Sequence, residues 1–403
     1  MRLFSYRGIT LIAAFAFVVG GVLVWLNYYF IEDLLHEYVE GSVTSEPPVI
    51  VEMTEGETGP EFLVQRIFFG TDRAIEDETF VGPVFGYESA DALSVGYRDV
   101  TIPSSVHEIG EIELPRRYSV FSVVLYQEAE DPERHFTIHE TKVLDEAAFL
   151  YEAGLAAAEA TTYDGSAFVF IHGFNTTFRA ASFRAAQLAY DLSFDGPAFL
   201  YSWPSVGAKM DYVTDIDSAE NAAPHMDEFL DLVFRVEGVD RVHIIAHSMG
   251  NEALAELLKR AGTKLDARTD KPVDQMVLAA PDLDARQFRT IADRFMRVAR
   301  GVTIYAASTD LALLASKSLR KDYMRLGDVG DTGPVVVPGI DSIDVSAVGT
   351  ELFSLNHNIY ARNRGVLDDL GRLFMTGTRP PHVRMPTLRA ETNADGTYWR
   401  MPN

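Results

Sequence analysis

A serine stands at the abrupt junction between an apolar segment and an amphipathic segment of the chain. The apolar run 242–246 stops just before Ser248, and helically spaced alanines and leucines follow over residues 251–260. The positions two before and two after the serine hold Ala246 and Gly250. A cramped turn from strand to helix requires small residues there. The pattern predicts a nucleophile elbow that presents the hydroxyl of Ser248 above a sheet, ready to attack a carbonyl carbon.

A serine hydroxyl is a poor nucleophile without a base, and the base needs a carboxylate to fix its tautomer. His357 follows the last predicted strand and is our candidate base, because a neutral imidazole can shuttle a proton near neutral pH. Two acids remain open. We favour Asp310, at the end of an earlier predicted strand, over Asp282, which follows the strand before that one and could instead cap the next helix.

Backbone amides near the serine can stabilise the oxyanion that forms during attack. Gly173 allows close backbone approach, so the amides of Phe174 and Met249 are predicted to form the oxyanion hole. His172, Gly173, Trp203 and His247 are predicted to shape the pocket. For Trp203 two interpretations stay open, a residue at the pocket mouth or a packed aromatic at a strand end. The side chain of His247 should point away from that of Ser248 and pack or orient.

From residue 167 onward, short apolar segments alternate with helical patterns. Strands are predicted at 168–171, 198–202, 241–246, 273–279, 302–307 and 340–345. Helices are predicted from the segment after His172 to about 194, and at 218–236, 249–261, 286–297, 311–319 and 359–374. This alternation is typical of a mostly parallel sheet with helices on both faces. The carboxyl ends of such strands gather at one edge, where the candidate residues would meet.

The segment before this alternation is rich in β patterns. Strands are predicted at 61–70, followed by Thr71-Asp72-Arg73, and at 93–103 and 118–127; a helix is predicted at 149–160. We therefore expect one α/β domain over residues 61–374 with a β-rich start at 61–127. Residues 375–403 are rich in Pro, Arg and Thr, and we expect a loose C-terminal extension.

The N-terminal residues predict a membrane anchor. Residues 9–31 are almost wholly apolar and long enough to span a bilayer, with Arg2 and Arg7 before them and acidic residues after them. This charge bias predicts that the domain lies outside the cytoplasm. A cleaved signal peptide is the alternative. We therefore assign residues 1–40 to a single-pass transmembrane anchor and 41–60 to a linker rich in Pro, Gly, Ser and Thr.

The composition excludes several classes of function. A net charge of −24 argues against a nucleic-acid partner, because phosphate binding needs basic surfaces. The chain has 0 cysteines, which rules out disulfides, thiolate metal sites and a cysteine nucleophile. No metal-binding motif or Gly-rich phosphate loop is visible, so we expect no cofactor.

Taken together, the sequence resembles the α/β-hydrolase superfamily, and more narrowly the bacterial α/β hydrolases of unknown function of the DUF900 type. The matching stretches are 69–73, 96–103, 170–175, 201–205, 246–250, 280–284 and 304–310, ending at His357. The resemblance implies an α/β-hydrolase fold with Ser248 as nucleophile, Asp310 as acid and His357 as base. It implies no natural substrate, and it does not extend to the N-terminal anchor.

These inferences predict a serine hydrolase of the bacterial inner membrane whose catalytic domain faces the periplasmic side. A small carboxylic ester or lipid is the expected substrate. An amidase or acyltransferase would need the same residues, and a non-catalytic binding module on the same fold is the remaining alternative.

Overall fold

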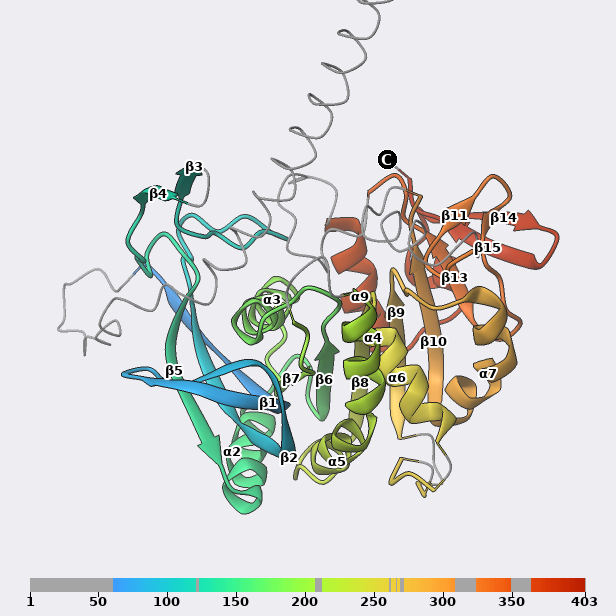
Figure 1. Ribbon diagram of the computed structural model, residues 1–403. Helices are drawn as coiled ribbons and strands as arrows, with labels where there is room; N and C mark the ends of the chain where they lie inside the picture. The colour runs from blue at the N-terminus through green and yellow to red at the C-terminus, as the bar shows by residue number, and fades with distance from the viewer. Residues whose placement is uncertain are drawn as a thin grey trace, which may run out of the picture.

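The computed structural model describes residues 61–120, 123–206, 212–260, 262–265, 267–268, 272–308, 324–348 and 364–402. An 11-stranded sheet forms its centre (Figure 1). In spatial order its strands are β14 (Arg389–Asn393), β15 (Gly396–Arg400), β13 (Asp341–Asp344), β10 (Ala299–Ala306), β9 (Val273–Ala279), β8 (Arg241–His247), β6 (Ser166–Ile171), β7 (Ala198–Ser202), β1 (Leu63–Thr79), β2 (Gly82–Ile102) and β5 (Thr137–Leu144). The strands from β15 through β1 are mutually parallel, whereas β14 and β2 run antiparallel to their neighbours.

Helices cover both faces of this sheet. One apolar layer packs under α2 (Glu146–Glu159), α4 (Tyr212–Asn221), α5 (Ala223–Val233), α6 (Gly250–Lys259) and α7 (Ala285–Val298). The other packs under α3 (Phe178–Asp191) and α9 (Arg364–Thr376). Successive residues of β6 alternate between the layers, with Val169 in the first and Phe170 in the second. Burial on both faces explains why these strands are continuous apolar runs.

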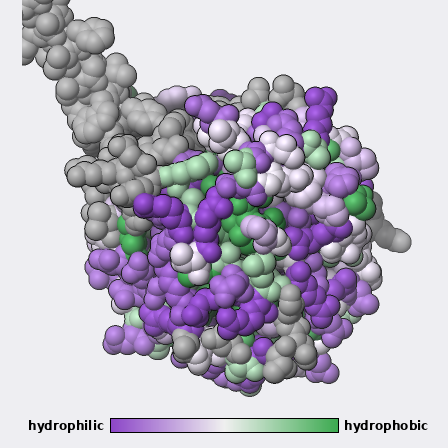
Figure 2. Space-filling model, turned by 90° about the vertical axis from the view of Figure 1, so that its right-hand side faces the viewer, coloured by the Kyte–Doolittle hydropathy of each residue, from purple (hydrophilic) through white to green (hydrophobic). Residues whose placement is uncertain are grey.

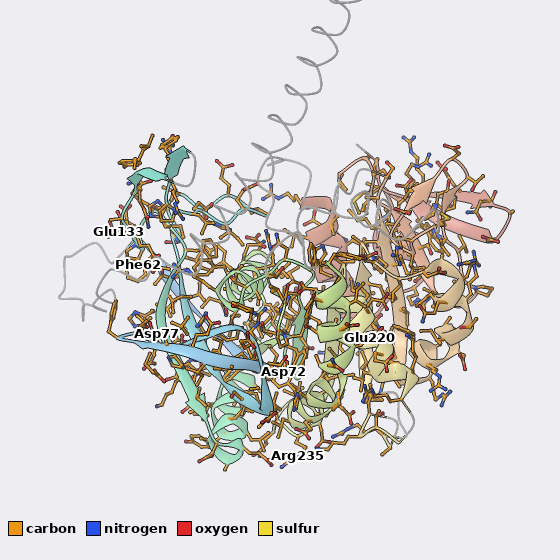
Figure 3. The ribbon with its side chains drawn as sticks, in the orientation of Figure 1. Phe62, Asp72, Asp77, Glu133, Glu220 and Arg235 are labelled. Atoms are coloured by element: carbon orange, nitrogen blue, oxygen red, sulfur yellow. The ribbon has the colours of Figure 1, made fainter. Side chains whose placement is uncertain are left out.

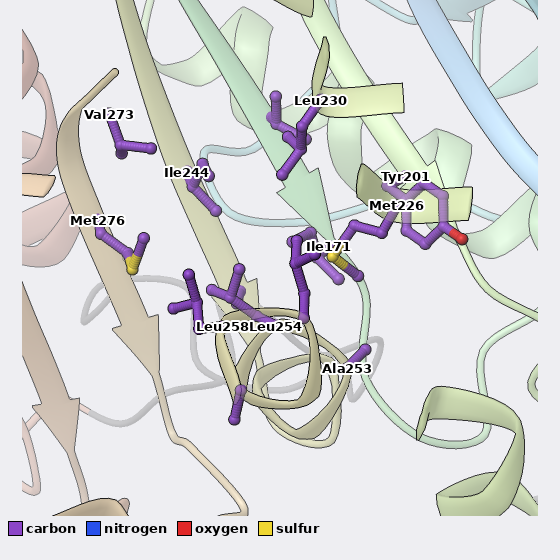
Figure 4. Packing of buried hydrophobic residues seen from close by; sticks show 14 of the residues in the cluster. Ile171, Tyr201, Met226, Leu230, Ile244, Ala253, Leu254, Leu258, Val273 and Met276 are labelled. Atoms are coloured by element: carbon purple, nitrogen blue, oxygen red, sulfur yellow. The ribbon is translucent and has the colours of Figure 1, made fainter. Parts of the chain in front are cut away.

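Figure 4 shows the layer beneath the predicted elbow. Ile171 of β6 and Ile244 of β8 pack with Leu254 and Leu258 of α6. The strand that leads to the serine and the helix that leaves it are therefore held on one apolar layer. This packing fixes the direction of both arms of the turn between them.

Most predicted elements are confirmed, and β7 and β9 have the predicted bounds. Other boundaries were wrong. The first strand does not end at residue 70 but continues through Thr71-Asp72-Arg73 to Thr79, because it pairs with β2 along its length. The predicted strand 118–127 is a hairpin of β3 (Arg117–Val120) and β4 (Val123–Gln127). The predicted helix 218–236 is two helices, α4 and α5, with Pro224 in the first turn of the second. Strand β5 was not predicted. The predicted helix 311–319 lies outside the described residues.

The expectation of a loose C-terminal extension was wrong. After the short helix α10 (Pro381–Arg384), β14 and β15 form a hairpin, and β15 joins the central sheet beside β13. Trp399 and Met401 are buried in the second apolar layer, so the tail completes the core. The outer strand β14 carries the exposed Arg389 and the half-buried Glu391, and charged side chains on an edge strand discourage pairing with further strands. Figure 2 shows this end of the molecule, whose surface is mostly hydrophilic.

None of the helices in the described part of the chain is both long and apolar enough to cross a bilayer. The predicted anchor at residues 9–31 and the linker at 41–60 lie outside the described residues. Both remain predictions from the sequence.

A buried ionic cluster fastens the segment between β2 and β3 to α3. His107 lies between two carboxylates, with Nε2 2.8 Å from Asp191 and Nδ1 2.9 Å from Glu113. The amide of Gly110 also donates to Asp191, at 2.7 Å. Burial by itself would lower the pKa of His107, but the hydrogen bonds that the ring donates to Asp191 and Glu113 raise this pKa to about 9. The charged imidazolium therefore donates to both acids at neutral pH.

We predict that His107→Gln destabilises the protein at pH 6–7 by at least ~1.5–3 kcal/mol, the usual contribution of a charged hydrogen bond. Folding raises the pKa of His107. Its stabilising contribution is therefore fully present below the pKa of the unfolded state and is lost as pH rises through about 9. Denaturant unfolding at pH 6.5 and at pH 10 measures the difference, with His139→Gln on β5 as the control. An equal loss of stability at pH 6.5 and at pH 10 would contradict a charged His107.

Candidate active site

Ser248 occupies a strained backbone position between β8 and α6. Its φ is +47°, in the left-handed region that non-glycine residues rarely adopt. Such a position costs on the order of 1–3 kcal/mol and persists only where surrounding contacts fix it. Here the amide of Ser248 donates to the carbonyl of Ala279 at 3.0 Å, and the layer beneath holds both arms of the turn. This is the backbone geometry that the nucleophile-elbow pattern predicted.

The turn after β6 approaches this elbow so closely that two glycines are required. A Cβ added to Gly250 would lie 2.5 Å from the carbonyl oxygen of His172. A Cβ added to Gly173 would lie 2.9 Å from the Cβ of Ser248. These separations are shorter than van der Waals contact, so neither position can carry a side chain without backbone movement. Ala246 is fully buried, which explains why the position two before the serine is small.

The predicted oxyanion donors lie on these two adjoining turns. Met249 is the fully buried N-cap residue of α6, and Phe174 follows Gly173. Neither of the two backbone amides donates to an acceptor among the described residues. Amides at a helix start lack intrahelical partners and favour negative charge. Their assignment as an oxyanion hole remains a prediction from the sequence.

Trp203 and His172 stabilise the turn after β6. Trp203 is fully buried, its indole Nε1 donates to the carbonyl of His172 at 2.9 Å, and the two rings stack with centroids 5.0 Å apart. Of the two interpretations of Trp203, the structure supports the packed aromatic. His172 also places Nε2 3.0 Å from the hydroxyl of Ser202. The side chain of His172 is thus turned into the protein behind the turn.

Arg73 is the centre of this brace, and the sequence analysis did not identify it as a site residue. Its side chain is buried, and Nη2 donates to the carbonyl of Thr176 at 2.7 Å while Nε donates to the hydroxyl of Ser202 at 3.0 Å. Nη1 donates to the carbonyl of Gly86 at 2.7 Å. The guanidinium thereby ties β1, β7 and the turn after β6 together. Two sequence signals pointed to it: a run of polar residues where an apolar strand was expected to end, and its place in the family-like stretch 69–73.

Asp215 of α4 supplies a second brace, and it too was missed. Its carboxylate accepts hydrogen bonds from the hydroxyl of Ser205 at 2.5 Å and from the amide of Val206 at 2.8 Å. The hydroxyl of Ser205 in turn accepts from the amide of Thr176 at 3.2 Å. Burial raises the pKa of Asp215, although these hydrogen bonds act to lower it. This network joins the segment after β7 to the end of the turn.

The two described histidines beside Ser248 are neutral. Burial lowers the pKa of His172 to about 3, and the nearby Arg73 guanidinium adds to the shift. Burial likewise lowers the pKa of His247 to about 3, with a contribution from Arg184. The ring of His247 packs against Gly173, since its Nδ1 would lie 2.9 Å from a Cβ there. Neither imidazole ionises near neutral pH.

Asp282, the alternative acid, is close to the elbow but engaged in a buried ion pair. Its amide donates to the carbonyl of Ser248 at 3.2 Å. Its carboxylate accepts from the hydroxyl of Tyr212 at 2.5 Å and lies 3.2 Å from Nε of Arg325. The ring of Tyr212 also packs edge-on against Phe174. Asp282 therefore holds the turns together and has two strong partners already.

Asp310 and His357 lie outside the described residues, so their distances to Ser248 are not part of the structure described here. Their roles remain predictions from the sequence. Among the residues that are described, no group of three or more His, Asp or Glu side chains has the arrangement of a metal site.

We predict that Gly250→Ala removes most Ser248 reactivity and lowers the melting temperature. The added Cβ would meet the carbonyl oxygens of His172 and Ile171 at 2.5 and 2.8 Å, and both turns would have to separate. Gly154→Ala on α2 is the matched control, because its Cβ would find only ordinary contacts, the nearest at 3.7 Å. That control should be neutral or stabilising by ~0.5–1 kcal/mol. Thermal unfolding and labelling of Ser248 measure both effects; equal behaviour of the two variants would refute the close approach.

Comparison with known proteins supports the same fold. No curated protein matches the sequence. The profile of a family described as "Alpha/beta hydrolase of unknown function (DUF900)" matches residues 152–373, more than half of the chain. The match runs from within α2 to within α9 and contains both turns of the site. The chain therefore belongs to this family of α/β hydrolases of unknown function.

Proposed function

We propose that this protein is a serine hydrolase that cleaves carboxylic esters through an acyl-enzyme on Ser248. The observation that carries the proposal is the left-handed backbone of Ser248, at a φ of +47°, packed against the turn that holds the Phe174 amide. Strained backbone of this kind clusters at reactive groups and ligand-binding sites. The family supports hydrolase chemistry but specifies neither nucleophile nor substrate.

In the proposed reaction, the Ser248 oxygen attacks the ester carbonyl carbon while His357 accepts the hydroxyl proton. The amides of Phe174 and Met249 stabilise the oxyanion of the tetrahedral intermediate. The carbon–oxygen bond to the leaving alcohol then breaks, and His357 returns the proton to that oxygen. Water, deprotonated by His357, then attacks the acyl carbon. The bond from this carbon to the Ser248 oxygen breaks, His357 returns the proton to that oxygen, and the carboxylic acid leaves. Asp310 orients His357 and stabilises its charged form.

Three alternatives use the same site differently. An amidase would cleave an amide through the same acyl-enzyme, and an acyltransferase would pass the acyl group to an alcohol instead of water. A binding module would not form the acyl-enzyme at all. Product analysis with added glycerol separates transfer from hydrolysis, and parallel ester and amide substrates separate the proposed esterase from an amidase.

We predict that a fluorophosphonate probe labels the wild-type protein and fails to label Ser248→Ala. The probe reacts only with an activated serine, because a base must take up the hydroxyl proton. Ser105→Ala, at an exposed serine between β2 and β3, is the matched control and should label like the wild type. Intact-mass spectrometry measures the adduct. A folded wild-type protein that stays unlabelled would favour the binding module.

The dependence of kcat/KM on pH for p-nitrophenyl esters tests the assigned base. His172 and His247 have pKa values lowered to about 3, so they cannot produce an ionisation near neutrality. We expect activity to fall as pH drops through ~6.5, the ordinary histidine value, and to be lost in His357→Gln. A profile without this ionisation, or one that survives in His357→Gln, would contradict the assignment.

The choice of acid is tested by two matched variants. We expect Asp310→Asn to lower kcat by on the order of 10³–10⁴-fold with little effect on stability. Asp282→Asn should instead break the buried pair with Arg325, with a stability loss of ~3–5 kcal/mol, and keep the wild-type pH profile when folded. Stability comes from denaturant unfolding and kcat from ester hydrolysis. The reverse pattern would make Asp282 the acid.

The location is part of the proposal and rests on the sequence alone. Residues 9–31 anchor the chain in the bacterial inner membrane, and the charge bias of their flanks places the hydrolase domain on the periplasmic side. A lipid or a small ester within reach of the membrane is then the expected substrate class.

A further inference from the structure

The hairpin formed by β3 and β4 exposes apolar side chains in an otherwise acidic protein. It is a separate two-stranded sheet that is not hydrogen-bonded into the central one. Its described side chains Tyr118, Leu125 and Tyr126 are 59%, 66% and 53% exposed. A two-stranded hairpin has no core of its own and is marginally stable in water. Exposed apolar groups concentrated on such an element indicate a surface that something else covers.

The exposed apolar side chains of the hairpin lie close together. Tyr118 and Tyr126 are directly opposite in the strand register, with ring centroids 6.0 Å apart, so they share one face. Leu125 lies at a β-bulge, because Ser119 pairs with Val124 and leaves Leu125 without a partner across the hairpin. Two exposed tyrosines and an exposed leucine are therefore neighbours on this element.

The sequence of the hairpin has the composition of an interfacial segment. Only two serines interrupt the apolar and aromatic run 118–126, and Arg116 and Arg117 precede it. Tyrosine is enriched at membrane interfaces, where its ring enters the apolar region and its hydroxyl stays hydrated. Arginine side chains extend toward phosphate groups at the same depth. A bilayer surface matches this order of residues along the hairpin.

The hairpin is located where the N-terminal segment enters the domain. β1 begins at Leu63, and Val64 pairs with Thr101, which in turn pairs with Thr137 of β5. The residue before Thr137, Phe136, donates its amide to Glu113, close in sequence to Arg116 at the hairpin base. Figure 3 shows Phe62 and Glu133 toward the same end of the molecule. A chain anchored through residues 9–31 would bring this end toward the membrane.

The base of the hairpin is also joined to the candidate site. Glu130 follows β4 and forms an ion pair with Arg179 of α3, at 2.5 Å, with both side chains about 6% exposed. Arg179 lies in the first turn of α3, which begins directly after the turn that contains Gly173 and Phe174. A contact between hairpin and membrane would therefore fix the position of this end of α3 relative to the lipid surface.

We propose that the β3–β4 hairpin inserts into the headgroup region of the membrane that anchors the chain. Tyr118, Leu125 and Tyr126 enter the interface, and the exposed Arg116 at the hairpin base meets lipid phosphates. The inference rests on the proposed membrane location and is independent of the proposed chemistry. The hairpin would give the domain a second, reversible contact with the bilayer, separate from the N-terminal anchor.

The absence of cysteines makes the test direct. A single cysteine is introduced in the full-length chain by Leu125→Cys and labelled with an environment-sensitive nitrobenzoxadiazole dye. The protein is reconstituted in vesicles of phosphatidylethanolamine and phosphatidylglycerol, with and without lipids brominated in the acyl chains. Tyr151→Cys on α2, 66% exposed, is the matched control. Far-UV circular dichroism verifies folding, and Tyr126→Cys gives a second hairpin position should Leu125→Cys misfold.

We expect the dye at position 125 to shift its emission to shorter wavelength and to lose intensity in brominated vesicles, while the dye at position 151 does neither. Equal behaviour at the two positions overturns the proposal. So does a dye at position 125 that is shielded from aqueous iodide yet not quenched by brominated lipid, because a protein surface would then cover the hairpin. Flotation of the protein with the vesicles reports membrane attachment separately. A protein that floats while position 125 stays in water therefore overturns the hairpin proposal alone, whereas one that does not float overturns the membrane location on which it rests.

Discussion

The close approach of two backbone turns is the constraint on which the candidate site depends. The turn after β6 and the turn after β8 meet at Gly173 and Gly250, where the backbone of one turn occupies the space a side chain would need on the other. This contact places Gly173 against Ser248, whose backbone is left-handed. Parallel neighbouring strands make the contact possible, because they deliver both turns to the same edge of the sheet.

Buried polar groups hold these turns in place from behind. Arg73, Ser202 and Trp203 reach the turn after β6 from β1 and from the end of β7. Asp282 and Arg325 form the corresponding buried pair beside the elbow. Each of these groups would be costly to bury alone, and each is matched by a partner from a different part of the chain. The site is therefore rigid because several distant elements must all be in place, and not because of one strong interaction.

The segment between β2 and β5 holds the helix α3 in place. It covers α3 and fastens both ends of that helix, through His107 and Asp191 at one end and Glu130 and Arg179 at the other. Because α3 lies between the sheet and this segment, it is buried almost throughout its length. A helix that only covers one face of a sheet keeps an exposed side. The β3–β4 hairpin extends from this segment with its apolar side chains exposed. The same segment thus stabilises the domain and offers the surface that we assign to the membrane.

The sequence by itself determined the features that depend on neighbouring residues. The elbow at Ser248, the strands β7 and β9 and the helices that follow the parallel strands were predictable because local apolar period and small residues specify them. Features made by distant segments were not. The residues around Arg73 do not indicate that it contacts Thr176, and those around Asp282 do not indicate its ion pair with Arg325. Nor does the C-terminal sequence indicate that β15 pairs with β13. Hydrogen bonds and strand pairing between remote residues depend on how the whole chain closes, so only the tertiary structure decided them.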